Sequence, residues 1–417
     1  MLKSKHMRIA MFSDIYTPSR DGVRTSIEEA KKSLEAAGHT VVVVTPSVPG
    51  WRDKERGVVR LASMGNPVTP TTAPTFRVAL PYPGLVGKVD RAVGKVDVIH
   101  SHTQGILGLL AWLVARRKGV PLVHTVHGFM YEIARKTPGQ MMVLLGFMTL
   151  GYPPFLALHG VKRGRYRLPK MPWAERAMLK LLLDIMTLAD ELVVPSPHVA
   201  KRLVGYGVKL PIAVVPSVID QADFKHPPAL PPSVKLPPRR AVRFLSVSRV
   251  SAEKRIEQLV EALGLLPRDE DWDAVIVGDG PSLAKCREMA AKLQIGDRVM
   301  FTGSQPNSVV ASIMAECDVF VLSSWHFDTQ ALTILESLAA GLAIVYCDDL
   351  LTVGLTPESA LLTEKSPQGM ATGMEQLLRD RTRLNDMKAA GLVLAKDFEQ
   401  PVMGQNLIKA YESIKSA

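Results

Sequence analysis

The sequence is poor in cysteine and carries no signal for export. Its 417 residues hold 3 cysteines, which are odd in number, scattered and without a C-x-x-C pairing: Cys286, Cys317 and Cys347. This pattern excludes a disulfide framework and favours reduced cysteines in the core of a cytoplasmic protein. The apolar run near the N-terminus is too short for a secretory signal, so we expect none.

Acidic side chains are in the minority. The chain has 40 Asp and Glu against 51 Lys and Arg, which gives a net charge of +11. This balance favours an anionic partner, whether nucleic acid, a phosphorylated ligand or an acidic membrane. We expect no nucleic-acid partner, because aromatic stacking platforms are missing beside the main basic cluster.

The chain is long enough and apolar enough to form the cores of two domains or three. Short apolar strands alternate with helical stretches in the first half at residues 8–14, 40–45, 96–100, 121–125 and 191–195. The pattern restarts at residues 243–248, 274–278, 298–302, 318–322 and 343–346. The fold class is therefore α/β, with two Rossmann-like, doubly wound domains whose parallel sheets bind ligands at the strands' carboxyl ends.

Six prolines between residues 227 and 238 mark a stiff connector between the two halves. We predict an N-terminal domain at residues 1–215, a linker at 216–240 and a second domain at 241–395. Residues 396–417 are expected to form a helix that packs back toward the N-terminal domain. A cleft is expected between the two domains.

The stretch from Ser323 to Gly341 is typical of a phosphate site. A strand at 318–322 is followed by apolar residues at helical spacing, with Thr329 the expected N-cap of the helix. The helix's first amides would then lack intrahelical partners and bind a diphosphate. These amides belong to Gln330, Ala331, Leu332 and Thr333.

Two carboxylates flank this predicted anion site. Glu336 lies roughly 10 Å further along the helix, at about 1.5 Å per residue, and can accept hydrogen bonds from two ribose hydroxyls. Asp328, just outside the helix, can meet hydroxyls at the ligand's other end. The stretch therefore fits a nucleotide sugar, and the alternative is an ordinary strand–loop–helix with surface carboxylates.

Other strand ends of the second half supply cations and close-approach glycines. Arg249 and Lys254 follow the strand at 243–248 and suit a diphosphate leaving group, unless they are solvated surface cations. Gly278 ends the next strand in a V-G-D-G-P loop, which is either close to a sugar or base or only a tight turn. Thr302 ends the strand after that and could flank the base.

Four histidines cluster at strand ends of the first half: His100, His102, His124 and His127. They are no obvious zinc site, because neither cysteine nor carboxylate accompanies them at ligand spacing. His127, just beyond a strand and before a glycine, is best placed to reach a ligand. Gly22 stands at the first strand-to-helix turn, where the backbone can approach a ligand closely.

The order of these motifs resembles the retaining family-4 glycosyltransferases of GT-B type. The match runs through V-I-H-S-H-T, H-T-V-H-G, S-R-x4-K, V-G-D-G-P and D-T-Q-A-L-T-I-L-E-S-L-A-A-G and covers nearly the whole chain. The resemblance implies a nucleotide-sugar donor held by the second domain, a retaining front-face transfer and no metal. It is closest to the members that glycosylate diacylglycerol, through the T-Q-x-L-T form.

The resemblance also implies roles for single residues. Arg249 and Lys254 would bind the diphosphate, and Glu336 the ribose. Asp328 and His127 would contact the transferred sugar, and Gly22 would lie near the phosphates. The family usually has Glu at position 328 and Gly at position 331, so a catalytically silent homologue that binds nucleotide or membrane stays an alternative.

Residues 137–161 lack Asp, Glu, Lys and Arg, but Gly151 and the prolines at 153 and 154 are expected to break this run into pieces too short to span a membrane. A monotopic wedge fits better, and it would insert Met142, Leu145 and Phe147 among acyl chains. A basic cluster suited to anionic headgroups follows, with Lys162, Arg163, Arg165, Arg167 and Lys170. The alternative is a buried core helix with a solvated loop.

Together with the resemblance, these patterns predict a peripheral enzyme on the cytoplasmic face of the membrane. It would move a hexose from a UDP-sugar to a lipid acceptor, with diacylglycerol the favoured one. The alternative within the same class is a GDP- or UDP-sugar transferase acting on phosphatidylinositol or a soluble polyol.

Overall fold

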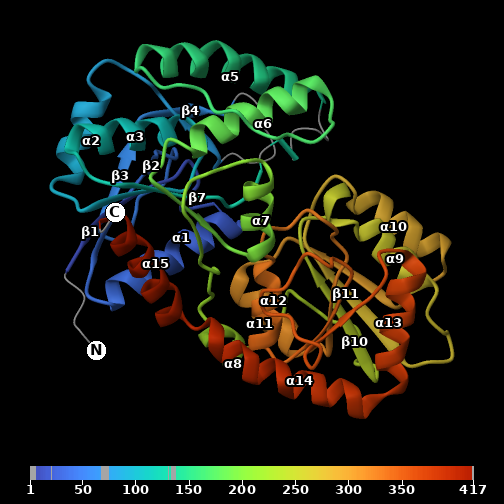
Figure 1. Ribbon diagram of the computed structural model, residues 1–417. Coiled ribbons are helices and arrows are strands. Elements are labelled where there is room, and N and C mark those ends of the chain that lie inside the picture. The colour runs from blue at the N-terminus through green and yellow to red at the C-terminus, as the bar shows by residue number, and fades with distance from the viewer. Residues whose placement is uncertain (1–5, 20, 67–74, 130, 133–137, 416–417) are drawn as a thin grey trace. The chain divides into compact units, whose positions relative to one another are not determined.

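The computed structural model describes residues 6–19, 21–66, 75–129, 131–132 and 138–415 (Figure 1). The chain divides into two compact units. The first comprises Met1–Ser217 and Gln400–Ala417, and the second comprises Val218–Glu399. Each unit has its own parallel sheet and its own core.

The first unit is built on a seven-stranded parallel sheet in the order β3-β2-β1-β6-β7-β8-β9. Its strands are β1 (Arg8–Phe12), β2 (Thr40–Pro46), β3 (Val58–Leu61), β6 (Val98–Ser101), β7 (Leu122–Thr125), β8 (Glu191–Val194) and β9 (Ile212–Val214). A small antiparallel pair joins β4 (Ser63–Gly65) and β5 (Arg77–Ala79). Its helices are α1 (Gly22–Ala36), α2 (Leu85–Val93), α3 (Ile106–Lys118), α5 (Pro138–Leu158), α6 (Trp173–Met186), α7 (Pro197–Gly205) and α15 (Gln400–Lys415).

The five strands predicted for this unit are present, with ends shifted by at most two residues. Four more strands, β3, β4, β5 and β9, were not predicted. Two of them lie at the edges of the large sheet, and all four are only three or four residues long. A strand this short has too few alternating positions to produce a periodic signal.

Helix α1 begins at Gly22, which was predicted to lie in the turn before the helix. Asp21 caps it, because its side-chain oxygen accepts a hydrogen bond from the Arg24 amide at 3.0 Å. Gly22 is therefore the first residue of the helix and does not lie in a turn before it. The helix still starts at the carboxyl end of β1, where a parallel sheet places its ligands.

The second unit contains a six-stranded parallel sheet in the order β12-β11-β10-β13-β14-β15. Its strands are β10 (Val242–Val247), β11 (Trp272–Val277), β12 (Val299–Gly303), β13 (Val319–Leu322), β14 (Ala343–Tyr346) and β15 (Ala360–Leu362). Its helical elements are α8 (Ala222–Lys225), η1 (Ala252–Lys254), α9 (Ile256–Gly264), α10 (Leu283–Lys292), α11 (Asn307–Ala315), α12 (Leu332–Ala339), α13 (Pro367–Arg379), α14 (Arg381–Ala395) and η2 (Lys396–Phe398). The five predicted strands are confirmed, and β15 was missed.

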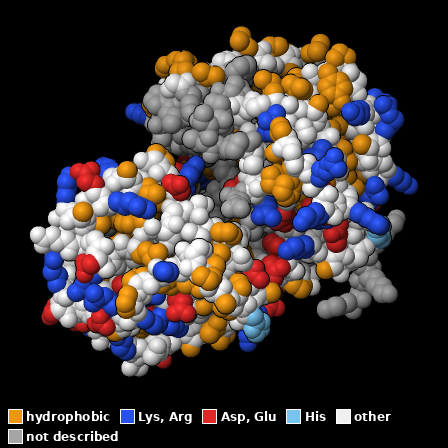
Figure 2. All heavy atoms as spheres, turned by 180° about the vertical axis from the view of Figure 1, so that it is seen from behind, with side chains coloured by type: hydrophobic (Ala, Val, Ile, Leu, Met, Phe, Trp, Pro, Cys, Tyr) orange, Lys and Arg blue, Asp and Glu red, His pale blue; other side chains and the backbone are white. Residues whose placement is uncertain are grey.

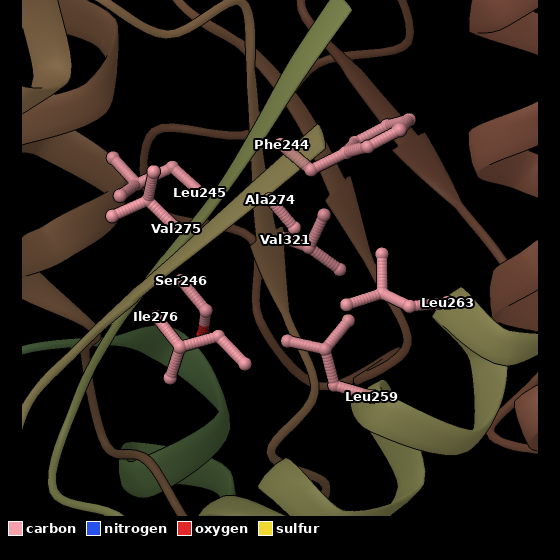
Figure 3. A pocket seen from close by; sticks show the side chains of 9 residues that line it. All are labelled: Phe244, Leu245, Ser246, Leu259, Leu263, Ala274, Val275, Ile276 and Val321. Atoms are coloured by element: carbon pink, nitrogen blue, oxygen red, sulfur yellow. The ribbon is translucent and has the colours of Figure 1, made fainter. Parts of the chain in front are cut away.

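Both faces of this second sheet are buried, as the continuous apolar strands require. Phe244 belongs to the core on one face and Leu245 to the core on the other. Figure 3 shows Leu245 and Val275 on one side of the strands, opposite Leu259 and Leu263 of α9. The space between the side chains in this view admits no water molecule, so it belongs to the packed core and is no ligand pocket.

The proline-rich segment packs on the second unit along much of its length. Phe224 and Val234 are buried in the core, and the Ser312 hydroxyl donates to the Pro228 carbonyl at 2.7 Å. Arg239 reaches both oxygens of Asp318 at 3.0 and 3.1 Å. The predicted boundaries at 215/216 and 395/396 thus differ from the unit boundaries, which follow Ser217 and Glu399.

Helix α15 returns the chain to the first unit and packs on α1. Gly404 lies so close to α1 that a Cβ atom there would stand 2.7 Å from the Ser33 carbonyl oxygen. The Ser33 hydroxyl donates to the Gln400 carbonyl oxygen at 2.6 Å. Tyr411, further along α15, is fully buried and reaches His100 of β6 at 2.7 Å.

The predicted break in the apolar stretch is wrong. Helix α5 runs without interruption from Pro138 to Leu158 and contains Pro153 and Pro154 in its last two turns. Among the described residues, no helix is both long and apolar enough to cross a membrane.

Candidate functional site

The predicted donor residues gather at the carboxyl ends of two neighbouring strands in the second unit. Arg249 and Lys254 follow β10, and the loop from Ser323 to Ala331 follows β13. These strands pair directly, with Phe244 beside Val319. The β10 and β13 loops therefore meet at one edge of the sheet, where doubly wound proteins bind their ligands.

Lys254 and Asp328 form a tight ion pair at this edge. The Lys254 ammonium lies 2.5 Å from one Asp328 oxygen, and the Ser324 hydroxyl donates to the other at 2.5 Å. The two side chains are only 18% and 10% exposed. Lys254 was predicted at the diphosphate and Asp328 at the sugar, so the ion pair makes these two positions immediate neighbours.

The Arg249 side chain is more exposed than that of Lys254. Its guanidinium pairs with Glu253 at 2.5 Å, yet the side chain remains 54% exposed. Glu253 in turn accepts a hydrogen bond from the Ser251 hydroxyl at 2.6 Å. An exposed guanidinium beside a strand end can offer several donors to a phosphate without leaving a buried charge behind.

The predicted N-cap of the following helix is wrong. Helix α12 begins at Leu332 with Ala331 as its cap residue, so Thr329 lies two residues before the cap. The Ala331 backbone is extended, at φ −84° and ψ 101°, which alanine adopts without strain. The first-turn amides therefore belong to Leu332 and Thr333 and not to Gln330 or Ala331, and Glu336 lies about one turn inside the helix.

The side chain of Glu336 is half-buried, and its carboxylate makes neither a hydrogen bond nor an ion pair within the described part of the chain. Burial raises the pKa of its carboxyl from 4.5 to about 7, because the charged form loses its hydration without gaining a partner. A carboxylate left unsatisfied at the ligand edge of a parallel sheet is a strong candidate for a ligand contact. Ribose hydroxyls are donors of the kind it lacks.

The glycines of the V-G-D-G-P loop are needed by the fold itself. A Cβ at Gly278 would lie 1.8 Å from the Ser248 carbonyl oxygen, and one at Gly280 would lie 2.3 Å from that of Val250. Both glycines have positive φ, at 137° and 158°. The loop is therefore a close packing of the β10 and β11 ends, and Thr302 at the end of β12 donates its hydroxyl to the Gly303 carbonyl at 2.9 Å.

The four histidines of the first unit lie at the ends of β6 and β7. His100 Nδ1 contacts the Tyr411 hydroxyl, and its Nε2 contacts the Thr125 hydroxyl, each at 2.7 Å. His102 Nδ1 lies 2.9 Å from His127 Nε2. The sequence did not indicate this pairing, because histidines 25 residues apart meet only when β6 and β7 are neighbours.

Burial keeps the histidine cluster neutral. It lowers the pKa of His127 from 6.5 to about 4 and that of His124 to about 3, and it lowers the pKa of His102 well below its usual range. Near neutral pH these rings therefore carry no charge. They can orient a sugar by hydrogen bonding and cannot act as cations.

A half-buried carboxyl that was not predicted from the sequence lies at the same edge of the first sheet as the histidines. Asp14, two residues after β1, accepts hydrogen bonds from the Thr103 hydroxyl and the Leu107 amide. Burial is the larger effect and raises its pKa from 3.8 to about 6. Its position directly after the first strand was a usable signal, since strand-end carboxylates meet at the ligand edge.

The predicted membrane segment is only partly exposed. Met142 is 49% exposed, whereas Leu145 is buried in the core of the first unit at 3% and cannot insert into lipid from there. The side chain of Phe147 lies outside the described residues. The prediction for Leu145 is wrong because an all-apolar helix gives no periodic clue to which face is buried.

Other apolar side chains of this region are more exposed than those predicted. Leu150 and Leu158 of α5 are 81% and 83% exposed, and Trp173 at the start of α6 is 70% exposed. Figure 2 shows apolar side chains gathered along the edge of the first unit that α5 occupies. The basic residues between the two helices are also exposed: Lys162, Arg163, Arg165, Arg167 and Lys170. Arg163 pairs with Asp184 at 2.7 Å.

Within the described ranges, a single group of side chains is spaced to hold a metal ion. It consists of His326, after β13, and Asp348 and Asp349, after β14. His326 Nε2 lies 2.8 Å from Asp349 and 3.8 Å from Asp348, and Asp348 is fully buried. A plain histidine–carboxylate pair accounts for this geometry, so we assign it no part in the chemistry.

Comparison with known proteins identifies the family. Residues 20–223 match "Glycosyltransferase Family 4", and residues 233–392 match "Glycosyl transferases group 1". The alpha-monoglucosyldiacylglycerol synthase of Streptococcus pneumoniae is 30% identical over 363 residues, which are 81% of this chain and 70% of that protein. The chain belongs to the group 1, family-4 glycosyltransferases.

A second relative agrees with this family-4 glycosyltransferase assignment, and a solved structure shares the fold. The alpha-monoglucosyldiacylglycerol synthase of Acholeplasma laidlawii is 27% identical over 353 residues, with 81% of this chain and 80% of that protein covered. The crystal structure of Anabaena HepE in complex with UDP matches 98% of this chain and 100% of that chain, with a TM-score of 0.65 and 15% identity. The predicted GT-B fold, with two Rossmann-like halves, is thereby confirmed.

Proposed function

We propose that this glycosyltransferase moves a hexose from a UDP-sugar to the free hydroxyl of diacylglycerol, with retention of the anomeric configuration. The proposed donor rests on one observation at the edge of the second sheet. There, two cations and the unpartnered carboxylate of Glu336 follow neighbouring strands. The acceptor half rests on the relatives named as monoglucosyldiacylglycerol synthases. The UDP in a solved protein of the same fold supports the choice of nucleotide.

In this proposal Arg249 and Lys254 neutralise the diphosphate of the donor, and the first amides of α12 add their dipoles. Glu336 in its ionised form accepts hydrogen bonds from the ribose hydroxyls. Asp328 and His127 hold hydroxyls of the transferred sugar. The charge on the leaving diphosphate grows as the bond to the sugar breaks, so the two cations stabilise the transition state more than the bound donor.

Transfer breaks the bond between the sugar's anomeric carbon and the diphosphate oxygen. The acceptor oxygen bonds to the same face of that carbon, and its proton passes to an oxygen of the departing diphosphate. This route requires no pair of catalytic carboxylates of the kind that glycosidases use. It also requires no metal, because Arg249 and Lys254 supply the positive charge.

We place the enzyme at the inner face of the membrane, where diacylglycerol is presented. The exposed apolar side chains of α5 and the start of α6 would enter the acyl region, and the basic loop between the helices would meet anionic headgroups. Neither feature spans the bilayer. Such a surface keeps the protein peripheral and its binding dependent on salt.

Replacing Leu150 and Leu158 together with serine is expected to weaken binding to anionic vesicles roughly tenfold or more, because each exposed leucine buries apolar area in the lipid. Sedimentation with phosphatidylglycerol-containing vesicles measures the loss. The matched control replaces Leu265 and Val393, which are 52% and 66% exposed on the second unit, and should leave binding unchanged. Equal binding of both double variants would reject the α5 surface.

A donor and acceptor panel tests the proposed reaction. Purified protein is incubated with UDP- and GDP-sugars and with vesicles that contain diacylglycerol, phosphatidylinositol or neither, and the lipid product is quantified. We expect a glycolipid only from a UDP-hexose with diacylglycerol. Product only from phosphatidylinositol, or only from a GDP-sugar, would replace the acceptor or the donor of the proposal.

A further inference from the structure

His102, which is buried, and His127, which is partly exposed, form a hydrogen-bonded pair of rings. His102 follows β6 and His127 follows β7, and the two strands are neighbours in the sheet. His102 Nδ1 lies 2.9 Å from His127 Nε2, and the rings stack with centroids 5.2 Å apart at 24°. His102 is only 6% exposed. The proposed function uses His127 and assigns nothing to His102.

Both rings of the pair are uncharged near neutral pH, and a single hydrogen lies between His102 Nδ1 and His127 Nε2. Among the described residues, the titratable groups that face the pair include His100 of β6 and His124 of β7, with Tyr411 of α15 behind His100. A neutral imidazole carries hydrogen on one nitrogen only. If His102 Nδ1 donates, the hydrogen of His127 is on its Nδ1, whereas if His127 Nε2 donates, its Nδ1 is bare. The two tautomers are therefore coupled.

The His102 ring makes no other hydrogen bond within the described residues. Its Nε2 is buried and makes no hydrogen bond there. His100 stacks on it with ring centroids 4.1 Å apart, and both nitrogens of His100 already bind Tyr411 and Thr125. His100 therefore holds the His102 ring in place without competing for its Nδ1.

We infer that His102 is a positioning residue, which fixes the tautomer and the orientation of His127 through the Nδ1–Nε2 hydrogen bond. It thereby decides whether His127 presents a donor or an acceptor to the transferred sugar. This inference rests on the proposed function, in which His127 contacts that sugar. It is the same arrangement that orients metal-bound and catalytic histidines, where a second group on one nitrogen sets the state of the other.

Two substitutions of His102 separate positioning from packing. Asparagine places a polar atom close to the position of Nδ1 and can keep the hydrogen bond to His127. Leucine fills a similar volume without any polar atom. We expect His102→Leu to lower kcat 10- to 100-fold with little change in the donor KM, and His102→Asn to stay within about threefold of the wild type. His226→Leu, an exposed histidine of the second unit, is the control and should change nothing.

Long-range ¹H–¹⁵N correlation spectra of the histidine rings give a readout that needs no substrate. The wild type and His102→Asn should show His127 as one tautomer, and His102→Leu should show a mixture of both. Unchanged kcat in His102→Leu, or equal losses in the leucine and asparagine variants, would overturn the inference. If the wild type makes no glycolipid, the proposed function fails, while a single His127 tautomer that is lost only in His102→Leu still supports the positioning.

Discussion

Replacing Glu336 with glutamine is expected to abolish sugar transfer and, at pH 8, to make the protein more heat-stable. The carboxylate is half-buried at the ligand edge of the second sheet, without a partner among the described residues. Glutamine keeps the shape, removes the charge and replaces one of the two accepting oxygens with an NH2 donor. One ribose hydroxyl therefore loses its acceptor, and a partly buried charge without a partner is removed. A substitution that abolishes function but stabilises the fold is typical of a functional site whose residues are kept at a cost in stability.

The pH dependence of this gain follows from the raised pKa. The pKa of Glu336 is about 7 in the folded protein, against its ordinary value of 4.5. An acid with a raised pKa destabilises the folded state as it ionises, so its cost is absent below pH 4.5, grows up to pH 7 and is complete above it. The full cost is at most about 3.5 kcal/mol, at roughly 1.4 kcal/mol per pH unit. Glutamine should therefore raise the melting temperature by several degrees at pH 8 and hardly at all at pH 4.5.

Thermal melts at the two pH values, together with initial transfer rates, check this prediction. Glu358→Gln, an exposed carboxylate of the same unit, is the matched control and should alter neither property. Transfer by Glu336→Gln at even a tenth of the wild-type rate would remove Glu336 from the donor site. A melting temperature that does not depend on the substitution at pH 8 would show that the carboxyl is already satisfied.

Replacing Lys254 with methionine is expected to lower kcat 100- to 1,000-fold, because the diphosphate loses a cation where its charge develops. The same change leaves Asp328 charged and largely buried, at a cost of roughly 2 kcal/mol of folding stability. Combining Lys254→Met with Asp328→Asn removes that uncompensated charge. The double variant should recover stability and remain inactive, as the two effects have different causes.

Urea unfolding and steady-state kinetics of the two single variants and the double variant form a complete cycle. Lys285→Met serves as the control, since Lys285 is 64% exposed and also pairs with a carboxylate, Glu257. It should cost less than about 1 kcal/mol and leave kcat unchanged. Activity restored in the double variant would mean that Lys254 and Asp328 form a structural salt bridge and do not contact the donor.

In each unit, the strands that are apolar throughout were predictable from the sequence. Strands β10 and β13 are buried on both faces, so every residue contributes to the signal, and their positions were predicted within two residues. Strand β9 is three residues long and only partly buried at a sheet edge, and it was missed. Helix α5 was predicted to break at Pro153 because proline removes an amide donor, yet the helix continues to Leu158.

The positions of the candidate residues at the strand ends were predictable from the sequence, but their contacts were not. Lys254 and Asp328 are 74 residues apart, and they meet because β13 pairs with β10 in the sheet order. Local patterns do not determine that order. The His102–His127 hydrogen bond has the same origin, since it joins the ends of two neighbouring strands.

The most direct test of the account follows the sugar itself. Purified protein is mixed with UDP-glucose labelled with ¹³C at the anomeric carbon and with diacylglycerol vesicles at pH 8, and the anomeric signal is followed by NMR. We expect the label to appear in a lipid as the α-anomer while an equal amount of UDP is released. A β-linked product, or label that appears only as free glucose, would contradict it.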